Sequence, residues 1–337
     1  MVNENYVSYP ATDRSYYALL RKGIHKQALT AGFDDKKLAH LDIIVAEITT
    51  NIFKHTSGAE ILCGVMGQGK HQYIEIISID DGPGFTDLPN MLLDGVSSVN
   101  TLGHGLGSIK RLSDFFGIYS QKGWGTVLVA RLHKQEYKED LHPIVVTSLV
   151  VAKPSEIESG DGCMYKSSER YFKLFLMDGL GHGPEAHQAV MEGFNAFKLC
   201  PYHDPAEIIR YMHNPLKRSR GGVGTVVVYD NASRKIEILG VGNISTKLVG
   251  NVDSRNIMSY NGIIGHNIPN TMKSQEVNAR DFKFIILCSD GIKSRWDISK
   301  YPMILRYDPT IIAAAIYKDF ARKTDDMSVV IIKTQNL

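Results

Sequence analysis

A polar, charge-dense run, HKQEYKEDLHP, interrupts the middle of the chain from His133 to Pro143. Segments with the pattern of strands are more frequent after this run than before it. The chain has 337 residues, more than a single hydrophobic core usually serves. We therefore predict two domains, residues 1–134 and 142–337, joined by a linker over residues 135–141.

Composition excludes several classes of protein. The chain is 43% hydrophobic and 22% charged, as in globular proteins, and its net charge of +2 predicts neither a nucleic-acid partner nor a membrane surface. It opens without a basic and apolar leader and has no apolar run of the roughly 18 to 20 residues that would span a bilayer, so we expect a cytoplasmic protein. The four cysteines form no C-x-x-C pair and predict reduced, mostly buried thiols: Cys63, Cys163, Cys200 and Cys288.

The first half contains a helix with two distinct faces. Its apolar residues recur at intervals of three and four, which predicts one buried stripe, and Asp34 or Asp35 precedes them as a cap. The stripe consists of Leu38, Leu41, Val45, Ile48 and Ile52. Glu47, Asn51 and His55, in the stretch EITTNIFKH, lie four residues apart in a row on another face.

This row has the chemistry of a nucleotide site. An asparagine oxygen suits Mg²⁺, which keeps phosphate oxygens and waters in its other positions, and Glu47 could orient or deprotonate an attacking group. A merely solvated helix face is the alternative, and it is the commoner explanation for such residues when they are taken alone.

Two glycine-containing segments follow. Asp80, in DDGPGF, ends a predicted strand over residues 73–79 and could accept a hydrogen bond from an exocyclic amine, while Gly82 and Gly84 would let the backbone approach a flat ligand. A plain turn is the alternative.

The second segment, GHGLGSIKRL, carries Gly103, Gly105 and Gly107 ahead of a helix expected from Ser108. Such a loop can bind phosphates at the helix start, although glycine-rich loops also serve as connections. A dinucleotide fold is excluded because serine stands where its third glycine should be, and no P-loop or protein-kinase motif is present.

The three segments, in this order and spacing, resemble the Bergerat ATP-binding fold of the GHKL superfamily over residues 1 to 134. Within that superfamily the chain resembles the anti-sigma-factor and stressosome serine kinases (RsbT/RsbW-like). The resemblance implies an α/β sandwich, a mixed sheet with helices on one face, that binds ATP and Mg²⁺. It assigns Asn51 as Mg²⁺ ligand, Glu47 as general base, Asp80 as adenine reader and Gly103 to Gly107 as phosphate loop.

The second half places aspartates beside small residues in four short segments. These aspartates are Asp161, Asp178 with the adjacent Gly179, Asp290, and Asp325 with Asp326. Three of the segments adjoin apolar runs that predict buried strands, and several like charges at strand ends need neutralisation. Oxygen ligands without paired histidines or cysteines favour two Mg²⁺ or Mn²⁺ ions, which can activate a water for phosphate hydrolysis. For any one segment, an Asp-Gly turn without a metal is the alternative.

The order and wording of these segments resemble the metal-dependent protein phosphatases (PPM), most of all the SpoIIE/RsbX-like branch, over residues 142 to 334. The resemblance implies a β-sandwich flanked by helices and a site that holds two Mn²⁺ or Mg²⁺. Asp178 would bridge the ions, and Gly179 would contribute its carbonyl. The carboxylate ligands would be Asp161, Asp290 and Asp325, with Asp178 and Asp290 essential to catalysis.

One residue of the PPM pattern has no counterpart, an early arginine that holds the substrate phosphate in many members. The candidates for its role are Lys153, Lys166, Arg170 and the cluster Lys217, Arg218 and Arg220, although a solvated loop is the commoner explanation for such a cluster. His182 could contact phosphate or cap the helix that Pro184 begins.

Together the two halves predict a two-domain α+β protein that acts as a bacterial partner-switching regulator. Its second half would dephosphorylate phosphoserine or phosphothreonine on a STAS-domain protein, and its first half would phosphorylate the same or a related partner. In the alternative hypothesis the first half is a non-catalytic, ATP-dependent binding module that sequesters a sigma factor or an antagonist.

Overall fold

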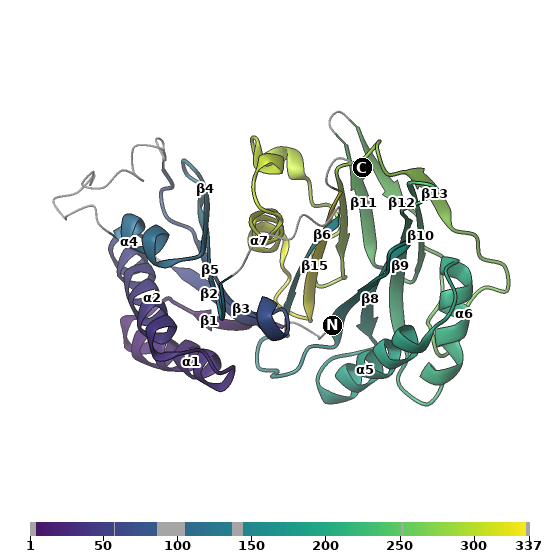
Figure 1. Cartoon of the computed structure of the whole chain (residues 1–337), viewed down its shortest axis with the longest axis horizontal. Helices are drawn as coiled ribbons and strands as arrows, with labels where there is room; N and C mark the ends of the chain where they lie inside the picture. The colour runs from purple at the N-terminus through teal and green to yellow at the C-terminus, as the bar shows by residue number, and fades with distance from the viewer. Residues whose placement is uncertain (1–4, 57, 86–104, 137–143, 251–252, 335–337) are drawn as a thin grey trace. The chain divides into compact units, whose positions relative to one another are not determined.

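The computed structural model describes residues 5–56, 58–85, 105–136, 144–250 and 253–334 (Figure 1). The chain divides into two compact units. The N-terminal unit consists of Tyr6–Glu139 and Tyr301–Ala315, and the C-terminal unit consists of Met1–Asn5, Asp140–Lys300 and Ile316–Leu337. Residues 301–315, predicted to belong to the second domain, are thus grouped with the first half of the chain.

The N-terminal unit is built on a five-stranded sheet in the order β1-β2-β3-β5-β4. Its strands are β1 (Val7–Pro10), β2 (Ala59–Met66), β3 (Tyr73–Asp80), β4 (Phe115–Gln121) and β5 (Gly125–His133). The two-domain α+β fold class is confirmed, but the expected mixed sheet is corrected, because neighbouring strands here are antiparallel. Strands β4 and β5 form a hairpin, and β5 is the strand of the hairpin that pairs with β3. This pairing is antiparallel and leaves β4 at the edge of the sheet.

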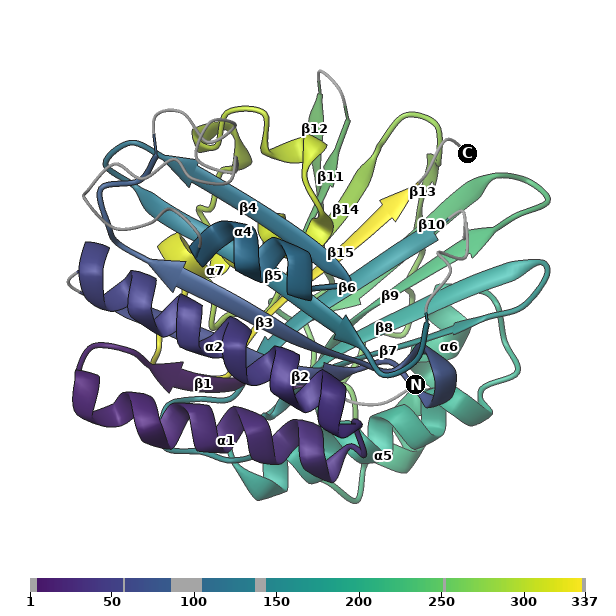
Figure 2. The same cartoon turned by 60° about the vertical axis from the view of Figure 1, so that its left-hand side comes forward.

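Helices cover one face of this sheet (Figure 2). They are α1 (Tyr17–Thr30), α2 (Asp35–His55) and α4 (Gly105–Leu112), with 3₁₀ turns η1 (Arg14–Tyr16) and η2 (Gly69–His71). Asp34 is the cap of α2, since its Oδ1 accepts a hydrogen bond from the Lys37 N–H at 2.7 Å. The predicted stripe of α2 is confirmed, because all five of its residues are at most 5% exposed in the core.

The opposite face of the sheet carries residues from far along the chain. Side chains alternate along a strand, so those of Glu75 in β3, Tyr119 in β4 and Arg131 in β5 point away from the helices. Gly117 in β4 occupies a position on the same face. Gly117 lies against Ile311, and the Tyr119 hydroxyl donates to the Pro302 carbonyl at 3.2 Å.

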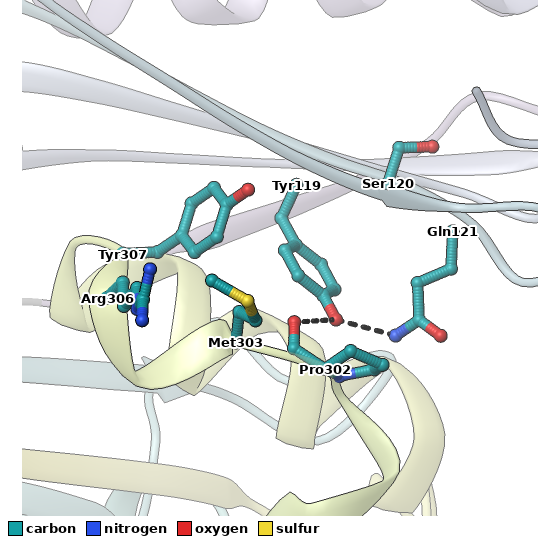
Figure 3. Close-up of a pocket in the computed structure, with 7 residues that line it drawn as sticks. All are labelled: Tyr119, Ser120, Gln121, Pro302, Met303, Arg306 and Tyr307. Carbon is teal, nitrogen blue, oxygen red and sulfur yellow. Dashed lines mark hydrogen bonds between the residues drawn. The ribbon is translucent and has the colours of Figure 1, made fainter. Parts of the chain in front are cut away.

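A cavity of about 450 Å³ lies on this face of the N-terminal unit (Figure 3). The Tyr119 ring meets the Tyr307 ring edge-on, with centroids 5.0 Å apart. The cavity is lined by Tyr119, Ser120, Gln121, Pro302, Met303, Arg306 and Tyr307. None of the residues predicted for a site is among them.

The C-terminal unit contains two further antiparallel five-stranded sheets. Their orders are β13-β10-β9-β8-β7 and β12-β11-β14-β15-β6. The strands of the first are β7 (Asp161–Ser167), β8 (Tyr171–Gly179), β9 (Gly222–Asp230), β10 (Lys235–Val241) and β13 (Gln275–Asn278). Those of the second are β6 (Ile144–Val151), β11 (Ser245–Val249), β12 (Ser254–Ile257), β14 (Phe284–Cys288) and β15 (Met327–Thr334).

The two sheets share one apolar core, as expected for a sandwich. Leu174 and Val227 from the first sheet and Leu287 and Val330 from the second belong to the same buried cluster. Two helices, α5 (Pro184–Leu199) and α6 (Pro205–Leu216), bury a second core against the first sheet. The unit also contains η3 (Ile298–Lys300). The last two elements of the chain before β15 are η4 (Ile304–Arg306), which belongs to the N-terminal unit, and α7 (Pro309–Phe320), which belongs to that unit up to Ala315.

All four cysteines are free and buried, as predicted. Across the described part of the chain, no helix combines the length and apolar character needed to cross a membrane.

Candidate functional site

The nucleotide-site residues of α2 lie beside the start of α4. Because the apolar stripe turns one face of α2 into the core, Glu47 and Asn51 are left half-buried on another face, and His55 is exposed. A Cβ added to Gly105, the first residue of α4, would stand 3.0 Å from Glu47 Oε2 and 3.3 Å from Asn51 Oδ1. The structure therefore brings Glu47, Asn51 and Gly105 together, although they come from different helices.

The helix that follows the glycines begins at Gly105, three residues before the predicted start at Ser108. Gly105 and Gly107 therefore belong to its first turn, and Gly107 is buried. Gly103 lies outside the described residues. Only the later part of the predicted phosphate loop can thus be placed, and that part offers the N-terminal backbone of a helix.

The Asp80 turn lies at the C-terminal end of α2. Asp80 Oδ1 accepts a hydrogen bond from the Gly82 N–H at 2.8 Å, and a Cβ at Gly82 would stand 3.2 Å from the His55 carbonyl oxygen. Gly84 has φ +68° and packs so closely on the Gln121 carbonyl that a Cβ there would overlap it. The two glycines thus permit close contacts within the chain, and their predicted approach to a ligand stays a prediction.

In the C-terminal unit, Asp161 and Asp178 are directly opposite each other on the paired strands β7 and β8. The neighbouring Gly179 pairs with Gly222 of β9, and its N–H donates to the Gly160 carbonyl at 2.8 Å. Strand pairing therefore places two of the predicted carboxylate ligands and the predicted carbonyl ligand at one end of one sheet.

Asp161 is 1% exposed, and Ser289 donates to its Oδ2 at 2.5 Å. Burial raises the pKa of the Asp161 carboxyl to about 8, despite the opposing effect of the Ser289 hydrogen bond. Its other oxygen, Oδ1, is buried without a hydrogen-bond partner among the described residues. A buried carboxylate with an unsatisfied oxygen needs a proton or a cation.

The Asp178 carboxylate is likewise in an unfavourable electrostatic environment. Burial raises the pKa of its carboxyl well above the usual value, and the charges of neighbouring aspartates raise it further. Those neighbours are Asp161, Asp290, Asp325 and Asp326. The charges of the other predicted carboxylate ligands therefore all act on the Asp178 carboxyl group.

Within the described ranges, no three histidine, cysteine, aspartate or glutamate side chains are already arranged as a ligand set. The donor chemistry nevertheless fits hard divalent cations, since the converging groups are oxygen donors and one of them has an unsatisfied buried oxygen. Asp161, Asp178, Asp290 and Asp325, with the Gly179 carbonyl, are the residues that would hold such ions.

The two adjacent aspartates at the start of β15 differ in role. Asp326 is 2% exposed, and its oxygens accept hydrogen bonds from the N–H groups of Lys153 and Gly160 at 2.8 and 2.9 Å. Asp325 is only half-buried, and its Oδ1 accepts from the Asp326 N–H at 3.0 Å. Asp326 thus ties together three segments of the backbone, which leaves Asp325 as the better placed of the two for a ligand.

Two polar residues at this site were missed from the sequence. Asn243, which follows β10, donates through Nδ2 to Asp290 Oδ2 at 2.8 Å. Ser289 joins Asp161 to β15, because its hydroxyl oxygen also accepts from the Ser328 N–H at 3.0 Å. Ser289 adjoins Asp290 in LCSDG, which was an available signal, whereas nothing local marked Asn243.

The lysines and arginines considered for binding the substrate phosphate have different partners. Lys166 donates to the carbonyls of Phe197 and Cys200 at the end of α5, at 2.7 and 3.1 Å. Arg170, which directly precedes β8, pairs with Asp230 at the end of β9. Asp178 lies at the opposite end of β8.

The histidine of the DGLGHG loop faces an acidic neighbour. His182 Nδ1 lies 2.9 Å from Glu156 Oε1. The cap position of α5 is Gly183, without a capping side chain, so the suggestion that His182 caps the helix is wrong.

Comparisons with known proteins found one family model and one curated relative that each match part of the chain. Residues 168–335 match the family described as Stage II sporulation protein E (SpoIIE). A curated relative, the serine/threonine-protein kinase RsbT of Bacillus subtilis (strain 168), is 31% identical over 99 residues, which cover 29% of this chain and 74% of that protein.

Two solved structures resemble the chain as well. One belongs to the bacterial stressosome, described as a modular system adapted to control secondary messenger signaling; it is 25% identical, with a TM-score of 0.52, over 56% of this chain and 99% of that chain. The other is RsbX in complex with magnesium, 18% identical with a TM-score of 0.50, over 58% of this chain and 97% of that chain, and this likeness shows the fold alone.

The family match and the relative define a fusion of a kinase-like domain with a protein phosphatase domain. The chain belongs to the RsbT family of serine/threonine-protein kinases in its N-terminal region and carries a SpoIIE-type phosphatase domain of the PPM class in its C-terminal region.

Proposed function

We propose that the C-terminal region hydrolyses phosphoserine or phosphothreonine on a STAS-domain protein in a partner-switching system. The observation that carries this proposal is the meeting of Asp161 and Asp178 across paired strands, with Asp161 Oδ1 buried and unsatisfied. Aspartates Asp290 and Asp325 add negative charge at the same place. This arrangement is unfavourable by itself and becomes favourable with bound cations.

Two Mn²⁺ or Mg²⁺ ions would supply Lewis acidity and an activated water for the hydrolysis. The chain's own residues would fix the geometry of the site. Asp178 and the Gly179 carbonyl lie at the end of β8, Ser289 orients Asp161, and Asn243 orients Asp290. Hydrogen bonds of this kind hold ligands in one orientation before the metal arrives.

The N-terminal region would bind ATP with Mg²⁺ and transfer its γ-phosphate to a serine or threonine of the same or a related STAS-domain partner. The supporting observation is the narrow space among Gly105, Glu47 and Asn51, which the Cβ of any other residue at position 105 would enter. Asn51 would hold Mg²⁺, Glu47 would act as the base, and Asp80 would bind the adenine. Residues 1–134 and 142–337 are the proposed limits of the two activities.

The competing function for the N-terminal region is ATP-dependent binding of a sigma factor or an antagonist without phosphate transfer. Labelled γ-phosphate separates the two, because transfer to a STAS-domain protein should occur with the wild-type chain and disappear in Glu47→Ala and Asn51→Ala. Glu47→Ala should retain ATP binding and Asn51→Ala should weaken it, since only Asn51 would hold the metal. ATP binding by the wild-type chain without any transfer would support the binding module.

The phosphatase is tested with a phosphorylated STAS-domain protein and with a small phosphomonoester. Hydrolysis should require Mn²⁺ or Mg²⁺, stop on chelation, and be lost in Asp178→Asn and Asp290→Asn while the circular dichroism spectrum stays unchanged. Full activity of the wild-type chain in excess chelator would contradict the two-metal proposal. Hydrolysis of the small ester but not of the phosphoprotein would support the phosphatase activity and exclude the STAS-domain substrate.

A further inference from the structure

The guanidinium of Arg220 lies over the loop that follows the predicted bridging ligand. Gly222 pairs with Gly179, and Arg220 stands two residues before Gly222 along the chain. A Cβ added to Gly181 would stand 2.9 Å from Arg220 Nη1, which places the guanidinium directly on the DGLGHG loop. Arg220 is thus a cation at the same end of the sheet as Asp178.

The backbone around Arg220 is well anchored. Its carbonyl oxygen accepts a hydrogen bond from His266 Nε2 at 2.8 Å, and the next residue, Gly221, accepts from the Leu180 N–H at 3.1 Å. Gly221 has φ +67°, a conformation that glycine adopts without strain, and lies close to the Ile264 carbonyl. These contacts tie the turn that carries Arg220 to the loop it covers.

Arg220 forms an ion pair with Glu185, in the first turn of α5. The side chains are 46% and 67% exposed, so a group carried on a protein substrate can reach them. An exposed ion pair contributes little to stability, and an incoming dianion can replace the carboxylate.

The other cations considered from the sequence are less suitable. Lys166 and Arg170 have carbonyl and carboxylate partners away from Asp178. Lys153 is closer, since its N–H donates to Asp326, but its ammonium has no hydrogen-bond partner among the described residues and so no defined position. Of these four cations, Arg220 is the one whose guanidinium lies against the DGLGHG loop.

From this geometry we propose that Arg220 and the DGLGHG loop form a binding subsite for the phosphoryl group of a phosphomonoester, and that Glu185 occupies the guanidinium until substrate displaces it. This inference rests on the proposed phosphatase function and names the residues that recognise its substrate. Guanidinium binds phosphate oxygens in a fork geometry, so Arg220 would take over the role of the arginine that the chain lacks early in the domain.

The test compares steady-state kinetics and phosphate binding of full-length variants in Mn²⁺. Arg220→Ala should raise the KM for a phosphopeptide and the Kd for inorganic phosphate about tenfold, with a smaller effect on kcat. Glu185→Gln should act in the opposite sense and lower both constants about threefold, because it frees the guanidinium. Arg220→Lys should restore part of the loss, and Arg170→Ala, which removes an exposed arginine at the other end of β8, should leave both constants unchanged.

Opposite effects on KM at Arg220 and Glu185 do not follow from a merely structural ion pair, since breaking such a pair from either side would have the same sign. An unchanged Kd for phosphate in Arg220→Ala, a raised KM in Glu185→Gln, or a loss confined to Lys153→Ala would overturn the inference. Calorimetry with inorganic phosphate separates it from the proposed function. A wild-type chain that binds phosphate through Arg220 but hydrolyses no ester would retain the subsite and refute the phosphatase, and one that binds no phosphate would overturn the subsite.

Discussion

Arg131 and Asp308 form a two-pronged ion pair although 177 residues separate them in the chain. Arg131 Nη1 donates to Asp308 Oδ2 at 3.0 Å and Nη2 donates to Oδ1 at 2.7 Å. The same guanidinium donates to Thr310 Oγ1 at 2.7 Å and through Nε to Glu75, which is 1% exposed. This half-buried network holds residues 301–315 within the N-terminal unit.

We expect Asp308→Asn to lower the free energy of unfolding of the N-terminal unit by about 2 kcal/mol at pH 7. The loss stays moderate because Arg131 keeps its ion pair with Glu75. Hydrogen exchange of the β5 amides measures the effect. Asp230→Asn, which weakens the exposed pair with Arg170, is the control and should change the stability of its own unit far less.

The effect of Asp308→Asn should depend on pH. Burial raises the pKa of Asp308, but the Arg131 guanidinium outweighs it and leaves the pKa below its usual value. A carboxyl group with a depressed pKa stabilises the fold above its unfolded pKa of about 3.9, and this contribution is lost as pH falls through the folded pKa. The difference between variant and wild type should therefore shrink below about pH 4; a difference that grows on acidification would contradict the ion-pair explanation.

Gly105→Ala should weaken ATP binding about tenfold while the fold is retained, because its Cβ would stand 3.0 Å from Glu47 Oε2. Titration calorimetry with ATP and Mg²⁺ measures this. Gly58→Ala is a matched control in the same unit, since the nearest atom to its Cβ would be Thr12 Cγ2 at an ordinary 3.8 Å. Equal affinities for the two variants would place the nucleotide elsewhere.

Asp178→Asn should raise the melting temperature of the C-terminal unit in EDTA although it abolishes hydrolysis. The substitution removes one of several carboxylates that repel one another, a relief of about 1 to 2 kcal/mol. Mn²⁺ should stabilise the wild-type chain by about 2.7 kcal/mol at one hundred times its Kd and the variant by less.

Scanning calorimetry with and without Mn²⁺ tests the Asp178 prediction. The control is Asp297→Asn, because Asp297 accepts hydrogen bonds from Ser299 and its pKa is lowered by them, so that its loss should destabilise slightly. A lower melting temperature for Asp178→Asn in EDTA would show that the carboxylates are not in conflict.

Asn243→Ala should reduce kcat about tenfold and weaken Mn²⁺ binding, since it removes the 2.8 Å hydrogen bond to Asp290 Oδ2. Asn243→Gln, which keeps the amide on a longer side chain, should fall between the alanine variant and the wild type. Metal titration monitored by melting temperature and by initial rate separates orientation of Asp290 from loss of fold. Wild-type metal affinity in Asn243→Ala would exclude Asn243 as a positioning residue.

The parts predicted correctly depend on short spacings. The stripe of α2 follows from a repeat of three and four residues, and the place of Asp178 at the end of a buried strand follows from the apolar run before it. The role of Asp178 as a metal ligand stays a prediction. The predicted start of α4 is three residues late. Glycine is unfavourable in helices and predicts a loop, but here Gly105 and Gly107 form the first turn of the helix. The antiparallel sheet was missed, because the position of β5 between β3 and β4 depends on how a hairpin is laid on the sheet.

By itself the sequence determined which short elements form, and which of them carry carboxylates, glycines and amides. The tertiary structure alone decided which of these groups meet. Asp161 with Ser289, Asn243 with Asp290, Arg220 with the DGLGHG loop and Arg131 with Asp308 each join separate segments. The physical reason is that helix and strand periodicity arises from neighbouring residues, whereas contacts across sheets and turns depend on how the whole chain packs its apolar surface.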